Sequence, residues 1–164
     1  MGPLESASPD ELLSDIDTKV VGYLRAAKAV APYMKQQGWG RIINIGGLAA
    51  RSAGAFSGMR NLALTHFTNT LSNELGPHGI TVNIIHPGST RTERTGPMQK
   101  SQAREQDLTI EEVERKAAAG IDIRRLVESE EIAYLTTFLA SPKASAITGE
   151  AIAAGGGVGS AVFQ

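Results

Sequence analysis

The stretch GRIINIGGLAARSAGAFSGMRNLALTHFTNTLSNELGPHGITVNIIHPG, residues 40–88, decides the fold of this chain. Residues 41–45 form a short apolar run rich in β-branched side chains, which predicts a buried parallel strand. The segment 46–58 is rich in glycine and alanine and lacks periodicity. We therefore expect a loop at the carboxyl end of that strand, where open α/β sheets carry their ligands. Apolar residues recur at helical spacing over 59–75, and residues 80–85 predict a second strand.

The flanking sequence predicts further helices and one more strand. A capping box at residues 8–11 opens a long amphipathic helix over about 9–37, and a second capping box at 109–112 opens a short helix. The acidic residues 128–131 begin another amphipathic helix, and residues 146–154 predict the last strand. This alternation predicts an α/β fold with a parallel sheet of about three strands and flanking helices.

Composition narrows the function classes. The 164 residues contain 41% hydrophobic and 20% charged side chains, which is ordinary for a globular protein. The formal net charge is −1 and the basic residues do not cluster, so a nucleic-acid partner is not expected. The chain has no cysteine, which excludes thiolate catalysis and disulfides. No apolar run approaches the roughly 18 residues of a membrane span. We expect a cytoplasmic protein without membrane or nucleic-acid partners.

Short motifs spaced from about Leu4 to Gly157 carry a family resemblance. They are Ala-x-x-Pro-x-Met at 29–34, Gly-Arg-Ile-Ile-Asn at 40–44, Glu-Leu-Gly-Pro at 74–77, Val-Asn at 82–83 before Pro87-Gly88, Glu-Ile-Ala at 131–133, Phe-Leu-Ala-Ser at 138–141 and Ile-Thr-Gly at 147–149. In this order they resemble the carboxyl-terminal, catalytic half of a short-chain dehydrogenase/reductase. The resemblance implies a partial Rossmann-like, doubly wound sheet in a single truncated domain, residues 1–164, that lacks the amino-terminal dinucleotide-binding units.

The resemblance also sets the cofactor expectations. Full-length members bind NAD or NADP through a glycine-rich turn whose backbone amides hold the pyrophosphate at a helix amino terminus. No Gly-x-x-x-Gly-x-Gly opens a helix here, and the glycine run at 155–159 is interpreted as a turn. A remnant of the family's nicotinamide loop stands at Pro87, Gly88 and Thr92. We therefore predict no cofactor for this chain.

The catalytic positions of the family are all replaced. The resemblance places its serine, tyrosine and lysine at Gly47, Arg60 and Leu64, and its frequent asparagine at Lys19. In the family the tyrosine passes a proton to the carbonyl oxygen as hydride arrives, the lysine lowers the tyrosine pKa and holds the ribose, and the serine orients the carbonyl. Arg60 cannot replace the tyrosine, because a guanidinium stays protonated far above neutral pH. No Tyr-x-x-x-Lys occurs in any frame, so no catalytic residue is intact.

Several polar residues have both a functional and a structural interpretation. Arg60 either binds a carboxylate or phosphate, or is solvated or salt-bridged. Ser52 and Ser57 either hydrogen-bond a ligand, or stabilise a turn and cap a helix. The polar candidates that lack any metal-ligand spacing, and for which structural roles are favoured, are His66, His86 and Asn44.

Two packing expectations follow from the apolar pattern. The second long helix should pack through Leu62, Phe67 and Leu71, with a solvated Arg60 whose loss leaves stability nearly unchanged. The strand at 41–45 should present an unpaired edge, which promotes association.

Two functions are compatible with these residues. In the first, the chain is a degenerate, truncated relative that transfers no hydride and associates through its two long helices, with its own copy or with a full-length relative. In the second, it is a fragment of an NAD(P)-dependent oxidoreductase, or a mis-started form of one, with an atypical active site in which Arg60 polarises an unknown carbonyl or alcohol substrate. A ligand-binding module without catalysis is a third possibility.

Overall fold

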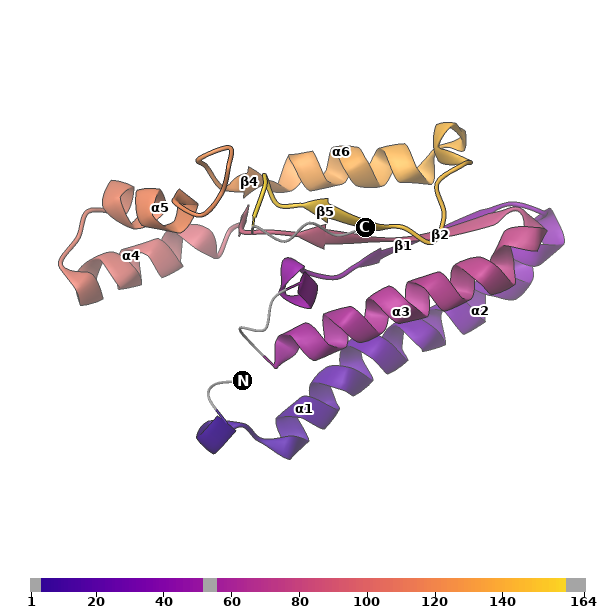
Figure 1. Ribbon diagram of the computed structural model, residues 1–164, viewed down its shortest axis with the longest axis horizontal. Helices are drawn as coiled ribbons and strands as arrows, with labels where there is room; N and C mark the ends of the chain where they lie inside the picture. Colours follow the sequence, from indigo (N-terminus) through magenta and orange to yellow (C-terminus); the bar gives the residue numbers. More distant parts are fainter. Residues whose placement is uncertain (1–3, 52–55, 159–164) are drawn as a thin grey trace.

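The computed structural model describes residues 4–51 and 56–158 and shows a parallel sheet with helices on both sides (Figure 1). The helices are α1 (Pro9–Ile16), α2 (Gly22–Gln37), α3 (Ser57–Leu75), α4 (Thr95–Gln106), α5 (Ile110–Ala118) and α6 (Ser129–Ala140), with a π-helical turn, η2 (Asp17–Val21), between α1 and α2. Short 3-10 turns lie at Leu4–Ser6, Leu48–Arg51, Gly76–His78 and Pro142–Ala144. The strands are β1 (Gly40–Ile45), β2 (Ile80–Pro87), β3 (Thr90–Arg91), β4 (Val127–Glu128) and β5 (Ala151–Ala154).

Three strands form the main sheet in the order β1-β2-β5, and both pairs are parallel. Gly40 lies opposite Ile80 and Ile45 lies opposite Ile85, so β1 pairs with β2 along its whole length. α2 and α3 lie on one side of the sheet and α6 lies on the other (Figure 1). The predicted α/β fold, a parallel sheet of three strands with flanking helices, is confirmed.

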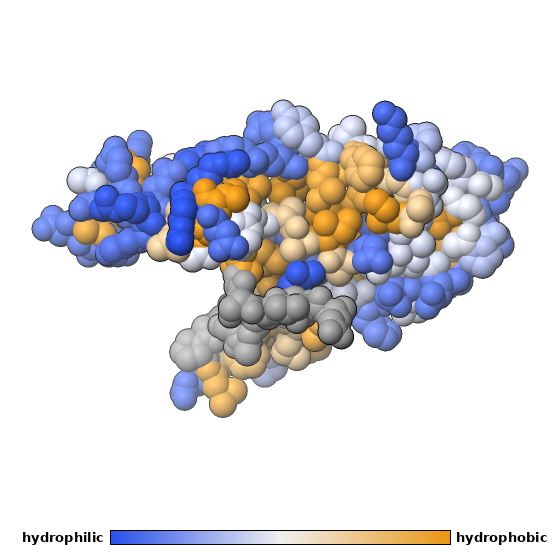
Figure 2. Space-filling view, turned by 45° about the horizontal axis from the view of Figure 1, so that its top comes forward, coloured by the Kyte–Doolittle hydropathy of each residue, from blue (hydrophilic) through white to orange (hydrophobic). Residues whose placement is uncertain are grey.

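The sheet separates two groups of core residues, because side chains alternate between the faces of a strand. The group beside α2 and α3 consists of Leu75, Ile80 and Val82, with Ala31, Met34, Ile42 and Leu71 packed against it. The group beside α6 consists of Ile85, Leu139 and Ala144, with Ile43, Ile45, Ile132, Leu135, Ile147, Ile152 and Ala154 packed against it. Many of these second-group residues are only partly buried, and apolar surface is visible across the middle of the molecule (Figure 2).

α3 buries a stripe that mixes polar and apolar side chains. Leu64 is fully buried whereas Leu62 is 59% exposed, so the prediction that this helix packs through Leu62 was wrong. The other two predicted packing residues are partly buried. Thr68 occupies the buried stripe because its hydroxyl oxygen accepts a 2.8 Å hydrogen bond from the Asn44 side chain on β1. Burial of a polar group costs little free energy when the group has a hydrogen-bond partner. Apolar periodicity alone does not detect such a residue.

The long amino-terminal helix is confirmed, with one difference. The Ser8 hydroxyl accepts a 3.3 Å hydrogen bond from the Glu11 amide, as the capping box predicts. Gly38 ends α2 with a φ of 66°, which is the left-handed conformation that favours glycine. Between these ends the helix passes through the π turn η2, which contains Lys19. The spacing of apolar residues does not distinguish a π turn from an α turn, because their hydrogen bonds differ in span by about one residue.

The connection after β2 contains structure that the sequence did not predict. The polar stretch before Asp107 forms β3 and the helix α4, which buries Thr95, Gln99 and Ala103 and has no apolar stripe. α4 and α5 form a helical hairpin that projects beyond the sheet (Figure 1). The predicted capping box opens α5, and the predicted last strand is shorter, at 151–154. Among the described helices, none is both long and apolar enough to cross a membrane.

We expect Leu64→Ala and Leu62→Ala to change the free energy of unfolding by different amounts, because Leu64 lies on the buried side of α3 and Leu62 on its exposed side. The first substitution leaves a cavity beneath a fully buried side chain and should lower the free energy of unfolding by about 2–5 kcal/mol. The second removes an exposed side chain and should change it by no more than about 0.5 kcal/mol. Urea denaturation followed by circular dichroism measures both, and equal losses would contradict this assignment of faces.

Candidate functional site

The candidate site lies at the carboxyl ends of β1 and β2, where the loop after β1 begins. The Gly46 amide donates a 2.8 Å hydrogen bond to the Ile85 carbonyl, and the Gly47 amide donates a 3.0 Å hydrogen bond to Nδ1 of His86. A Cβ atom on Gly46 would lie 2.5 Å from Nδ1 of His86, which is closer than atoms can approach. Glycine at this position therefore allows the loop to cross directly over the histidine ring.

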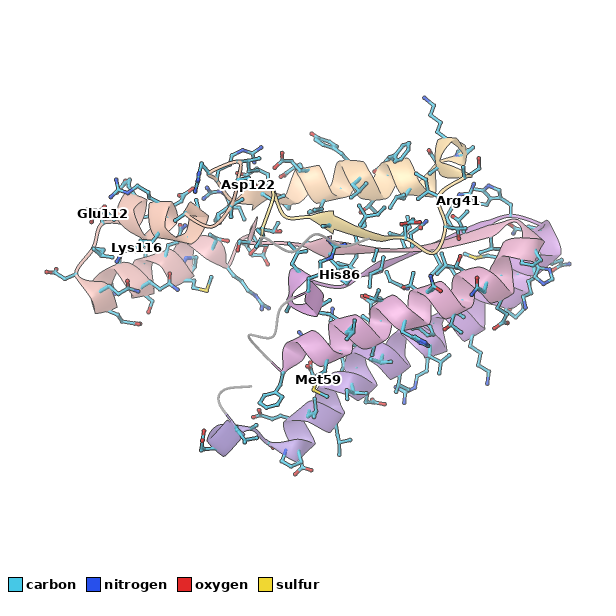
Figure 3. The ribbon with its side chains drawn as sticks, in the orientation of Figure 1. Arg41, Met59, His86, Glu112, Lys116 and Asp122 are labelled. Carbon is cyan, nitrogen blue, oxygen red and sulfur yellow. The ribbon has the colours of Figure 1, made fainter. Side chains whose placement is uncertain are left out.

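His86 is buried and uses both ring nitrogens (Figure 3). The Thr65 hydroxyl donates to the Asn61 carbonyl at 3.0 Å, so its oxygen is left to accept from Nε2 of His86, also at 3.0 Å. Nδ1 already accepts from Gly47, which assigns the neutral form with its proton on Nε2. Burial and the positive charge of Arg51 lower the pKa of His86. The structural role favoured for this residue fits these contacts.

Arg60, at the position where the resemblance places the family's tyrosine, forms an ion pair with Asp15 of α1. Their side chains are 26% and 22% exposed, so the guanidinium is salt-bridged rather than solvated. Its Nε is buried without a hydrogen-bond partner. The pair joins α1 to α3, which argues against the expectation that loss of Arg60 leaves stability nearly unchanged.

The other positions that the resemblance assigns to catalysis have different surroundings. Leu64, where it places the lysine, is completely buried. Lys19, at the asparagine position, lies with its ammonium 5.8 Å from the centre of the Tyr23 ring, a cation–π arrangement. At the serine position, a Cβ atom on Gly47 would lie 3.1 Å from Nδ2 of Asn61.

Two of these four positions line one depression. Arg60 and Lys19 line a polar depression of about 620 Å³, together with Asp10, Glu11, Ser14, Asp15 and Thr18. Three acidic side chains accompany the two cations there, so the depression has no net positive charge to attract a phosphate or carboxylate ligand. The interpretation of Arg60 as an anion-binding residue is not supported.

Pro87, Gly88 and Thr92, which the resemblance assigns to a nicotinamide loop, lie at the end of β2 and just beyond it. Pro87 ends β2, and the Gly88 amide donates to the Ala154 carbonyl at 3.2 Å. A Cβ atom on Gly88 would lie 2.7 Å from the Cα of Gly155, so glycine is required for this approach. Thr92 is exposed and its amide donates to the Thr95 hydroxyl at 2.9 Å. The three residues keep a defined backbone geometry and leave the Thr92 side chain accessible.

The remaining candidates add no reactive group. Ser52 lies outside the described residues, and nothing is described of the Ser57 side chain. His66 is exposed on α3. In the part of the chain that the structure describes, no group of three or more His, Asp and Glu side chains could hold a metal ion. Sequence reasoning missed Asp15 and Thr65 as partners of Arg60 and His86, because these contacts join residues distant in the sequence.

Comparison with known proteins identifies the family. A family model described as enoyl-(acyl carrier protein) reductase matches residues 1–159, so the chain belongs to this family of short-chain dehydrogenases/reductases. The NADPH-dependent reductase BacG of Bacillus subtilis (strain 168) is 35% identical over 156 residues, which cover 93% of this chain and 60% of BacG. The short-chain reductase protein NovJ of Streptomyces niveus is 36% identical over 147 residues, which cover 87% of this chain and 53% of NovJ.

Solved structures agree with this assignment. The NADPH-dependent reductase YwfH, involved in bacilysin biosynthesis, superposes with a TM-score of 0.87 at 34% identity, covering 97% of this chain and 62% of YwfH. L-sorbose reductase from Gluconobacter frateurii superposes with a TM-score of 0.90 over 97% of this chain and 62% of its own, and at 24% identity it shows the fold alone. The chain thus spans about three fifths of the length of these relatives.

We expect His86 to make stability depend on pH. Its folded-state pKa is lowered, so between that pKa and the unfolded value of about 6.5 the unfolded chain binds more protons. The contribution of neutral His86 is complete above about pH 6.5 and is lost as the pH falls toward the folded pKa. The free energy of unfolding should therefore decrease from pH 7.5 to pH 5.5 in urea titrations.

Two histidine variants test whether His86 is the source of this pH dependence. His86→Gln replaces the ring with an amide that does not titrate and should flatten the dependence. His66→Gln removes an exposed histidine on α3 and should leave the dependence unchanged. Equal slopes in the wild type and His86→Gln would show that another group is responsible.

We also expect the Arg60–Asp15 pair to contribute to stability as a unit. Arg60→Ala leaves a mostly buried carboxylate without its partner and should lower the free energy of unfolding by about 1–3 kcal/mol. The double variant Arg60→Ala/Asp15→Ala removes the uncompensated charge and should recover part of that loss. A double-mutant cycle by chemical denaturation measures the coupling, and additive losses would show that the pair is not coupled.

Proposed function

We propose that this chain is a member of the short-chain dehydrogenase/reductase family that transfers no hydride as it stands and acts by association. The observation that carries this proposal is the state of the replaced catalytic positions. Arg60 is paired with Asp15, Leu64 is fully buried, and Gly47 contributes only its backbone amide, which is bonded to His86. Each position has a structural partner, and none presents an acid or base to a substrate.

Reduction of a carbonyl needs a proton donor at the oxygen as hydride reaches the carbon. The Arg60 guanidinium stays charged beside Asp15 and returns no proton at neutral pH. His86 contacts the loop at Gly47, but it is 1% exposed and both of its nitrogens are engaged. Without a donor the chain loses a contribution usually worth about 10²- to 10⁴-fold in rate.

A cofactor is not part of this proposal. The family binds a dinucleotide through a phosphate loop at a helix amino terminus, and the sequence has no Gly-x-x-x-Gly-x-Gly in that context. Pro87, Gly88 and Thr92 remain as the part of the site that would contact the nicotinamide. This short loop offers few contacts, and a dinucleotide is held mainly by its phosphates, so we expect the loop alone to bind it weakly.

The alternative is an NAD(P)-dependent oxidoreductase with an atypical active site, for a carbonyl or alcohol substrate. The relatives favour it, since BacG and YwfH are named NADPH-dependent reductases and are 35% and 34% identical to this chain over the matched part. The retained turn at Gly88 and the accessible Thr92 also favour it. In this reading Arg60 would have to leave Asp15 to polarise a substrate, which is why we prefer the first proposal.

Association through the two long helices has support in their exposed side chains. α3 exposes Met59 and Leu62, at 52% and 59% of their surface. Met59 lies near the start of the helix (Figure 3). Leu13 of α1 and Leu24 of α2 are exposed as well. We propose that these four residues, the helical face, contact a second copy of this chain or a longer relative, because burying exposed apolar surface is the main driving force for such contacts.

We expect no catalytic activity from this chain alone. Titration with NADH or NADPH, followed by cofactor fluorescence, should show no binding in the micromolar range, and a panel of carbonyl compounds should cause no oxidation of either cofactor. The triple variant Gly47→Ser/Arg60→Tyr/Leu64→Lys should remain inactive, because it restores side chains without a phosphate site. Micromolar binding by the unmodified chain would overturn the proposal in favour of the oxidoreductase.

Association should depend on the helical face. Leu62→Glu places a charge within it and should weaken self-association at least tenfold in sedimentation equilibrium. Lys116→Glu, on the projecting hairpin, changes an exposed charge elsewhere and is the control (Figure 3). Equal effects of the two substitutions, or a wild-type chain that is monomeric at micromolar concentration and does not bind a longer relative, would exclude this surface.

A further inference from the structure

The loop after β1 is attached to the end of β2 through His86, and the direction of each hydrogen bond at this ring is determined. The Gly47 amide can only donate, so Nδ1 of His86 accepts from it. On the other side of the ring Nε2 donates to the Thr65 hydroxyl, whose own proton is used on the Asn61 carbonyl. Together the two contacts require a neutral imidazole, because an imidazolium donates from both nitrogens and accepts at neither.

Protonation of this ring would place two donors against each other. The imidazolium would present an N–H at Nδ1 to the N–H of Gly47. The His86 ring is fully buried, and the close packing of the interior leaves it little room to turn aside. Gly47 is only partly buried and lies in a short loop, so the loop is the part that can move. The Gly46 amide is bonded to Ile85, which makes the step from Gly46 to Gly47 the point of separation from the sheet.

The charges around His86 also oppose the imidazolium. Burial lowers the pKa of His86, and so does the positive charge of Arg51, at the end of the 3-10 turn Leu48–Arg51. From α3 the ring faces the uncharged Thr65, and on β5 its neighbour is the uncharged Ala153. A protonated ring therefore repels Arg51, which belongs to the same loop as Gly47. The repulsion and the loss of the hydrogen bond both act on this loop.

The same loop carries Leu48, which packs on Gly88 and Gly155. These two residues follow β2 and β5, and we call their contact the glycine junction. A Cβ atom on Gly155 would overlap Cδ1 of Leu48, and a Cβ atom on Gly88 would lie 3.2 Å from it. The Leu48 side chain thus occupies the space beside both glycines. Because Leu48 directly follows Gly47, its position depends on the bond between Gly47 and His86.

We propose that His86 is a pH-sensitive switch of this loop. The neutral ring holds Gly47 in place, and protonation of the ring releases residues 47–51 and moves Leu48 away from the glycine junction. The loop is held at neutral pH. Below about pH 6.5 the released form becomes more favourable by up to about tenfold per pH unit, which is the slope for one proton. The switch involves neither hydride transfer nor the helical face, so it and the proposed function can fail separately.

Hydrogen exchange followed by NMR on the full chain tests this proposal. From pH 7.5 to pH 5.0 the protection of the Gly47 amide, corrected for the intrinsic exchange rate, should fall by at least about fivefold. Low urea concentrations should leave it unchanged, because release of a short loop exposes little surface. The same urea should accelerate exchange of the Ile84 amide, which donates to Glu150 within the sheet. Cross-peaks between the Leu48 methyl groups and Gly155 should weaken as the pH falls.

Two variants complete the test. His86→Asn keeps an acceptor near the position of Nδ1 and removes the titration, so protection of the Gly47 amide should stay constant over this pH range. His66→Gln removes an exposed histidine on α3 and should retain the wild-type response. If His86→Asn does not fold, the wild-type measurements still decide, since they need no variant.

Three results would overturn the proposal. One is a Gly47 amide whose protection is constant down to pH 5.0. Another is an equal urea dependence of the Gly47 and Ile84 amides, because Gly47 would then exchange only by unfolding of the whole chain. The third is a protonated His86 ring, seen in its nitrogen signals, with unchanged Leu48 cross-peaks. The ring would then have turned and left the loop in place.

Discussion

Burial of the central strand β2 is the constraint on which the other layers depend. Residues 80–86 are all buried, and the strand has a parallel neighbour on each edge. Buried backbone groups must be paired, so β1 and β5 are required for β2 to exist in the interior. The helices then cover the two faces that this pairing creates. Because His86 lies at the end of the strand, the same constraint also determines the path of the loop after β1.

The positions that the resemblance assigns to catalysis are each held by a different kind of structural contact. Leu64 belongs to the core, where an unpaired lysine ammonium would be costly. Arg60 is paired with Asp15 of α1. Gly47 has no side chain, and its backbone amide is bonded to His86.

The fold could be predicted because its signals are local in sequence. The β-branched runs of β1 and β2 and the capping boxes before α1 and α5 each lie within a few residues, and all four elements are present. Contacts between distant residues could not be predicted. Asp15 and Arg60 are 45 positions apart, and nothing in either neighbourhood indicates the partner. The buried face of α3 was misjudged for a related reason, since Thr68 is buried only because Asn44 of another element is in reach.

Two glycines explain how the loops of the family fold keep their path in this chain. Gly46 and Gly88 have no space for a side chain, because a Cβ atom would meet the His86 ring in one case and the Gly155 backbone in the other. The path of both loops is therefore determined by close backbone packing. The same packing maintains the family fold, which the superposition on YwfH shows for this chain.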